Sequence, residues 1–227
     1  MQQIFLFGLP GVGKSYIGKL LEEKYNFLFW DGDQALSPEM KEYIRREEPF
    51  TSEMTAQLSS NIISTIHSLV EEEQRSKEGR PIAIAQAMLI EGDRQTIKEH
   101  FPDMQFIHVV SDKDIANKRI DQRNDWVSVS FAENIRSVFE RIRGQTEKYP
   151  TLVNNSDGNL HIEQQLQFLL GLEASTAEQT ALGTTSVTEA ANVSLLAIKN
   201  FWNDMMAPVN RSEHLEDDSS MTNCIRR

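Results

Sequence analysis

The chain has 227 residues and a mass of 25.9 kDa, a length that suits one domain with an appendage and excludes a large multidomain machine. Its residues are 39% hydrophobic and 25% charged, which is ordinary globular composition and excludes collagen-like or wholly disordered classes. The formal net charge of -11 argues against binding along nucleic-acid phosphates or an anionic membrane, because both need clustered Lys and Arg. We therefore expect neither a nucleic-acid nor a membrane partner.

Five short apolar runs have the composition of buried strands, and segments with helical spacing separate them. The runs are 4–7, 27–30, 82–85, 106–110 and 150–153. This alternation predicts an α/β protein with a doubly wound, five-stranded parallel sheet flanked by helices. Helix starts are predicted from capping signals at Ser37, Thr51, Ser111 and Ser130.

The composition changes after residue 172, so residues 1–172 are predicted to form the core domain. Residues 173–186 are rich in Ala, Ser, Thr, Gly and Gln and predict a polar linker. An apolar stripe predicts an extra C-terminal helix over 187–207, followed by a mobile tail over 208–227. The stripe leaves three alternatives open: docking on the core domain, which we favour, pairing with a second copy as a homodimer, or binding a protein partner.

Cys224 is the single cysteine, so the chain has no internal disulfide and no cysteine-based zinc site. The first apolar run lacks the basic segment and the cleavage site of a signal peptide. No stretch of the sequence is long and apolar enough to span a bilayer. These features predict a cytoplasmic protein.

A complete phosphate-binding loop pattern lies between the first predicted strand and the helix after it. Its glycines let backbone N–H groups surround a triphosphate, its lysine reaches the terminal phosphates, and its serine hydroxyl suits Mg²⁺. ATP is favoured over GTP because no Asn-Lys-x-Asp segment is present. A loop that binds phosphate without catalysing transfer stays an alternative. The predicted nucleotide-binding residues of this loop are Gly8, Leu9, Pro10, Gly11, Val12, Gly13, Lys14 and Ser15.

Two carboxylates, Asp31 and Asp33, follow the second predicted strand at the edge where open α/β sheets bind ligands. One carboxylate can hold Mg²⁺, directly or through water, while the other orients or deprotonates an attacking hydroxyl. The alternative is an Asx turn that closes the strand, because Asp and Gly are ordinary turn residues.

Lys118, Arg119 and Arg123 lie on or just after the helix that follows the fourth predicted strand. The spacing of Arg119 and Arg123 places both guanidinium groups on one helix face. Guanidinium groups stack on adenine or bind phosphate oxygens in pairs, which predicts a lid that closes over ATP. A solvated basic face is the alternative.

These residues resemble the small-molecule kinases of the gluconokinase and shikimate kinase type, within the nucleoside-monophosphate-kinase-like P-loop group. The resemblance covers about the first three quarters of the chain and looks closest to gluconokinase. It is carried by 8–15, 29–33, 48–51 and 119–123, in the family's order.

The resemblance implies a role for each matching position. Asp31 helps to hold magnesium through water, and Asp33 meets the acceptor hydroxyl. Arg119 packs on adenine, Arg123 contacts phosphate, and Asn154 belongs to the loop that borders the adenine.

The chain departs from the gluconokinase pattern at 86–91, where a basic pair expected to meet a sugar-acid carboxylate is replaced. It also lacks the triple glycine of shikimate kinases and has Asn124-Asp125-Trp126 where gluconokinases have Gly-His-Phe after the second lid arginine. Candidates for an anionic acceptor are Arg45, Arg46 and Arg94, although the first two also suit a helix surface.

The sequence hypothesis is an ATP-dependent small-molecule kinase that uses Mg²⁺, with Lys14, Asp33 and Arg123 as catalytic residues, Ser15 and Asp31 as metal-binding residues, and Arg119 and Asn154 beside the nucleotide. The first guess for the acceptor is an anionic, gluconate-like sugar acid. The alternatives are a nucleotide-binding regulatory protein without a small-molecule acceptor, and a nucleotide or nucleoside kinase of the same fold.

Overall fold

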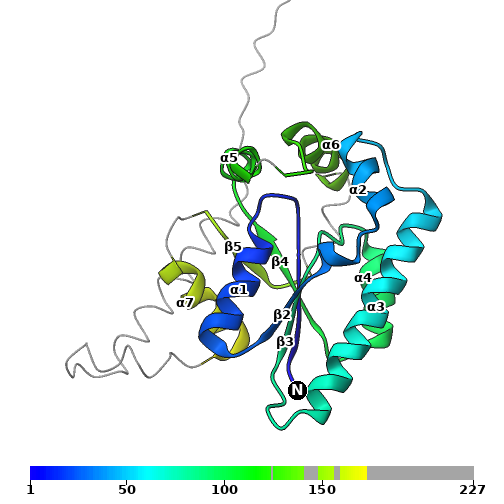
Figure 1. Cartoon of the computed structure of the whole chain (residues 1–227). Helices are drawn as coiled ribbons and strands as arrows, with labels where there is room; N and C mark the ends of the chain where they lie inside the picture. Colours follow the sequence, from blue (N-terminus) through cyan, green and yellow to red (C-terminus); the bar gives the residue numbers. More distant parts are fainter. Residues whose placement is uncertain (124, 141–147, 156–158, 173–227) are drawn as a thin grey trace, which may run out of the picture. The chain divides into compact units, whose positions relative to one another are not determined.

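The computed structural model describes residues 1–123, 125–140, 148–155 and 159–172 (Figure 1). The predicted linker, C-terminal helix and tail lie outside the described residues. Among the helices of the described part, none has the length and apolar character needed to cross a membrane.

The centre of the domain is a five-stranded sheet in which all paired strands are parallel, as the sequence predicts. The strand order is β2-β3-β1-β4-β5, so β1 lies in the middle and the chain winds outward in both directions. The strands are β1 (Gln3–Phe7), β2 (Leu28–Asp31), β3 (Ile82–Ala85), β4 (Gln105–Val110) and β5 (Thr151–Val153).

Helices connect these strands, as parallel pairing requires. Ser37 caps α2 by accepting a hydrogen bond from Met40 N, and Thr51 caps α3 by accepting one from Met54 N. A short 3₁₀ turn that the sequence analysis did not predict follows β2. The elements are α1 (Lys14–Tyr25), η1 (Gly32–Ala35), α2 (Pro38–Arg45), α3 (Ser52–Arg75), α4 (Glu91–His100), α5 (Lys113–Arg123), α6 (Val129–Glu140) and α7 (Asn159–Leu170).

The predicted cap of α6 at Ser130 is wrong. Ser128 is the residue whose hydroxyl accepts a hydrogen bond from a first-turn N–H, that of Phe131, at 2.9 Å. Ser130 instead donates its hydroxyl to Glu47 Oε2 at 2.9 Å, and Ser128 donates to Glu47 Oε1 at 2.7 Å. The start of α6 is thereby joined to the loop after α2.

Alternating side chains of β1 divide the core into two layers. Ile4 and Leu6 belong to a cluster with α1 and α7, whereas Phe5 and Phe7 belong to a cluster with α3 and α4. In Figure 1, α1 and α7 accordingly cover one face of the sheet, and α3 and α4 cover the other. The helices α2, α5 and α6 lie beyond the carboxyl ends of the strands, where the candidate site is found.

Arg94 is a structural residue of this core rather than a ligand for an anionic acceptor. Its side chain is fully buried, with the guanidinium carbon 4.6 Å from the centre of the Phe7 ring. Nη1 donates to Met88 O at 2.6 Å, and Nη2 pairs with Glu91 Oε2 at 2.9 Å. Arg94 therefore holds the loop after β3 in place, and its side chain is not free to contact a substrate.

We predict that Arg94→Met lowers the free energy of unfolding by about 3 kcal/mol, because it removes one partner of a buried ion pair. Arg45→Met is the matched control: Arg45 is exposed and pairs with Glu42 on the surface of α2, so its loss should cost less than about 1 kcal/mol. Urea unfolding monitored by circular dichroism measures both values. Equal effects of the two substitutions would contradict the structural role of Arg94.

Candidate active site

The phosphate loop connects β1 to α1 and is packed too closely for side chains at its glycines. Gly11 and Gly13 have φ angles of 80° and 92°, which glycine adopts without the strain of other residues. A Cβ atom on Gly13 would lie 2.1 Å from Asn154 Nδ2, and one on Gly11 would lie 2.4 Å from Ala116 O. The loop is therefore held against α5 and the segment after β5.

Lys14 curls back over this loop: its Nζ donates to Gly8 O at 2.9 Å and to Leu9 O at 3.0 Å. Burial lowers the pKa of Lys14 from 10.5 to about 8, with Arg123 adding to the decrease and the carboxylates of Asp33 and Asp31 opposing it. The ammonium group is poorly solvated and needs negative charge nearby, which a triphosphate supplies.

The two predicted carboxylates lie side by side after β2. Asp31 Oδ1 accepts a hydrogen bond from Asp33 N at 3.1 Å, so the predicted Asx turn is present together with the carboxylate pair. Burial and the neighbouring charge of Asp31 raise the pKa of Asp33, while Lys14, Gln86 and Arg123 oppose the rise. A carboxylate with a raised pKa is a stronger base towards a hydroxyl proton.

The oxygen donors at this edge fit a magnesium ion bound together with nucleotide phosphates. Ser15 lies in the first turn of α1, and both Ser15 and Asp31 line the same cavity. Within the described ranges, no group of three or more Asp, Glu, His or Cys side chains is placed to hold a metal by itself. This agrees with the usual coordination of Mg²⁺, which binds one or two protein oxygens and completes its coordination sphere with phosphate oxygens and water. A cation here would also relieve the repulsion that raises the pKa of Asp33.

Arg119 and Asn154 join the end of β5 to the phosphate loop and α5. Arg119 Nη1 donates to Asn154 O at 3.0 Å and to Ser111 Oγ at 3.3 Å. Asn154 is buried, and its Nδ2 donates to Val12 O at 2.8 Å. The alternative of a solvated basic face holds for exposed Lys118 but not for Arg119.

Arg123 ends α5 and is about half exposed, with its Nε 3.6 Å from Asp125 Oδ2. It is near enough to Lys14 and Asp33 to lower the pKa of both. The guanidinium group can therefore act on charge that develops between these two side chains.

A cavity of about 1520 Å³ brings most of the predicted site residues together. Gly8, Leu9 and Val12 shape the loop without lining the cavity, and neither Arg45 nor Arg46 lines it. The last two are exposed and pair with Glu42, so their predicted contact with an acceptor is not supported. The predicted site residues that line the cavity are Pro10, Gly11, Gly13, Lys14, Ser15, Asp31, Asp33, Arg119, Arg123 and Asn154.

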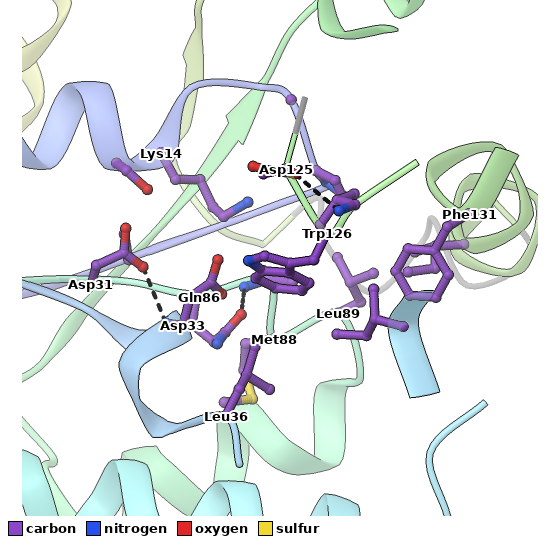
Figure 2. A pocket seen from close by; sticks show the side chains of 18 of the residues that line it. Lys14, Asp31, Asp33, Leu36, Gln86, Met88, Leu89, Asp125, Trp126 and Phe131 are labelled. Carbon is purple, nitrogen blue, oxygen red and sulfur yellow. Dashed lines mark hydrogen bonds between the residues drawn. The ribbon is translucent and has the colours of Figure 1, made fainter. Parts of the chain in front are cut away.

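Gln86 and Trp126 also line the cavity, although no sequence motif marks them as site residues. Figure 2 shows Gln86 beside Asp33, and it shows the Trp126 indole directed into the cavity. A usable signal was the position of Gln86 directly after a buried strand, where the other strands also place polar site residues. Trp126 gave no comparable signal, because its place depends on packing with Phe131 against the cluster that contains Leu36.

No protein-family model matches the sequence, and no curated protein matches it significantly. The chain is nevertheless similar to solved kinase structures. A gluconokinase from Sinorhizobium meliloti 1021 is 18% identical, with a TM-score of 0.56 over 72% of this chain and 88% of that chain. A sugar kinase from Janibacter sp. HTCC2649 is 17% identical, with a TM-score of 0.61 over 74% of this chain and 94% of that chain.

A shikimate kinase from Acinetobacter baumannii, solved in complex with shikimate, is 16% identical, with a TM-score of 0.51 over 75% of this chain and 94% of that chain. The chain has the P-loop kinase fold. The fold class predicted from the sequence is thus confirmed, and gluconokinase and shikimate kinase, the two families it resembles in sequence, are both among the structural neighbours.

We predict that binding of Mg-ATP takes up protons at about pH 9, roughly one unit above the lowered pKa of Lys14, where this lysine is largely deprotonated in the free protein. The negative triphosphate raises the pKa of Lys14, so the bound state holds more protons than the free state. Calorimetric titration in buffers of different ionisation enthalpy measures this uptake. Lys14→Arg should remove it, because a guanidinium stays charged throughout; the same uptake in both proteins would contradict the assignment.

Proposed function

We propose that the protein is an ATP-dependent phosphotransferase that moves the γ-phosphoryl group to a hydroxyl of a small molecule. The observation that carries this proposal is the convergence of Lys14, Asp31, Asp33 and Arg123 on one cavity. Typical small-molecule pockets measure about 300–1,000 Å³, so the larger volume found here suits a nucleotide and a second molecule together. In agreement with the sequence hypothesis, the reaction is assigned to the cytoplasm.

The transfer needs no covalent enzyme intermediate. The acceptor hydroxyl oxygen forms a bond to the γ-phosphorus, the bond from that phosphorus to the β–γ bridging oxygen breaks, and ADP leaves with the bonding electrons. The hydroxyl proton passes to Asp33, whose raised pKa suits it to receive a proton.

The remaining groups position the reactants and balance their charge. The N–H groups of the phosphate loop and Lys14 hold the terminal phosphates, and Arg123 stabilises the negative charge on the moving group. Arg119 and Asn154 border the base of the nucleotide. Mg²⁺, held by Ser15 and by Asp31 directly or through water, would neutralise phosphate charge when bound.

The gluconate-like acceptor that the sequence suggests gains no support from the geometry. Of its three candidate ligands, Arg94 is buried in the core and the other two are exposed outside the cavity. The class of acceptor therefore has to be inferred from the side chains that line the cavity.

We predict that Asp33→Asn lowers kcat by about 100-fold to 10,000-fold while Mg-ATP binding stays near the parental value, because the amide keeps the shape but accepts no proton. Lys14→Ala should weaken ATP binding as well as abolish transfer. Steady-state ADP release and calorimetric ATP binding separate the two effects.

Asp103→Asn, at an exposed position outside the cavity, is the matched control and should behave as the parent. Transfer by Asp33→Asn at the parental rate would rule out Asp33 as the base. ATP binding with no acceptor-dependent ADP release for any alcohol would favour the regulatory alternative.

A further inference from the structure

The cavity has two ends of different chemistry. The phosphate loop, Arg119 and Asn154 form the nucleotide end, whereas the part beyond Asp33 has a predominantly apolar wall. This wall combines the residue after η1, the loop after β3, the segment before α6 and the first turn of α6 (Figure 2). Its members are Leu36, Met88, Leu89, Trp126, Val127 and Phe131.

Two contacts hold this apolar wall in place. Trp126 packs with Phe131 against a buried cluster that contains Leu36 and Met40. Met88 adopts a φ of 34°, an unfavourable value for a residue with a side chain, and its carbonyl oxygen is held by Arg94. The wall is thus anchored to the core on both sides and offers a preformed apolar surface to a ligand.

Gln86 places an amide donor beside Asp33 at the start of this wall. Its side chain is 5% exposed, and its amide lies close enough to the Asp33 carboxylate to lower the pKa of Asp33. Nε2 makes no regular hydrogen bond with another protein atom. The other amide atom, Oε1, is occupied by Ala87 N, which fixes the direction of Nε2. The Nε2 amino group carries two hydrogens, so it can interact with Asp33 and also donate to an oxygen atom of a ligand bound beside it.

The charges around this end disfavour an anion. Besides Asp33, the carboxylates of Glu47, Glu48, Asp93 and Asp125 line the cavity. Burial raises the pKa of Asp93, so its carboxylate is already poorly solvated. A carboxylate on the acceptor would add a like charge beside these carboxylates.

Five basic side chains of the described residues line the cavity, and the proposed function assigns three of them to the nucleotide. Lys14, Arg119 and Arg123 are committed to the nucleotide under the proposed function. Lys19 and Lys41 are the other basic side chains that line the cavity within the described part of the chain. Lys41 lies on α2, whose Met40 and Ile44 share a cluster with Leu36, Trp126 and Phe131, so it is the basic residue on which we expect an anionic acceptor to depend.

We propose that the acceptor is a non-anionic alcohol with an apolar body. Its hydroxyl oxygen accepts a hydrogen bond from Gln86 Nε2 and gives its proton to Asp33, and its body packs against Trp126 and Met88. The proposal rests on the proposed function for the transfer step, in which the hydroxyl oxygen bonds to the γ-phosphorus as ADP leaves. The recognition of the alcohol is independent of that step.

Three ligands of related shape test the recognition: hydrocinnamyl alcohol, hydrocinnamate, which replaces its alcohol carbon by a carboxylate, and gluconate. Calorimetry or equilibrium dialysis measures their binding to the full chain saturated with magnesium and a non-hydrolysable ATP analogue. The proposal expects the alcohol to bind about tenfold or more tightly than either anion. Tighter or equal binding of gluconate or hydrocinnamate, or no detectable binding of the alcohol up to its solubility, overturns the proposal.

Two substitutions connect the binding to this wall. Gln86→Leu should weaken binding of the alcohol, and Leu89→Lys should weaken it while strengthening binding of hydrocinnamate. Phe168→Lys introduces the same charge at an exposed apolar residue of α7 outside the cavity and should change neither affinity. Lys41→Met should also leave the affinity for the alcohol unchanged; a large loss there, or parental affinity in Gln86→Leu, contradicts the proposed placement.

Failure of this inference and failure of the proposed function give different results. If the alcohol binds as expected but no alcohol stimulates ADP release, the recognition is right and the phosphotransfer is wrong. If ADP release depends on Lys14 and Asp33 but responds only to anionic acceptors, the phosphotransfer is right and the recognition is wrong.

Discussion

Parallel pairing of five strands is the constraint on which the site depends. Because the strands run in one direction, their carboxyl ends meet at one edge of the sheet, and each contributes a segment to the site. The phosphate loop follows β1, and the four other strands lead to Asp31, Gln86, Ser111 and Asn154. The register makes this convergence tight, since Ala85 at the end of β3 pairs with both Leu6 and Asp31.

Burial shifts the pKa values of two charged side chains where these strands end. Lys14 and Asp33 have pKa values displaced toward their neutral forms by burial, and each opposes the displacement of the other. Neither group is stabilised as fully as it would be in water. Under the proposed function, a triphosphate would supply the missing negative charge beside Lys14, and a hydroxyl proton would neutralise Asp33.

The sequence predicts the sheet and the position of the glycine-rich loop between β1 and α1, because both depend on local patterns. The five strands lie within a residue or so of the predicted runs, and the phosphate loop is a continuous segment whose glycines meet their steric requirements locally. The acceptor end could not be predicted in the same way. From the sequence, Arg94 suits a ligand for an anionic acceptor, but the core buries its guanidinium group against the Phe7 ring. Trp126 lines the cavity because it packs with Phe131 of α6.

The central claim is that the γ-phosphoryl group leaves ATP for an alcohol. Phosphorus NMR of the wild-type chain with Mg-ATP and a panel of neutral, cationic and anionic alcohols follows the phosphorus atom itself. The account predicts a new phosphomonoester resonance that grows as the γ-phosphate resonance declines, and only in the presence of an acceptor. Growth of the inorganic phosphate resonance alone, or no change with any alcohol, would contradict it.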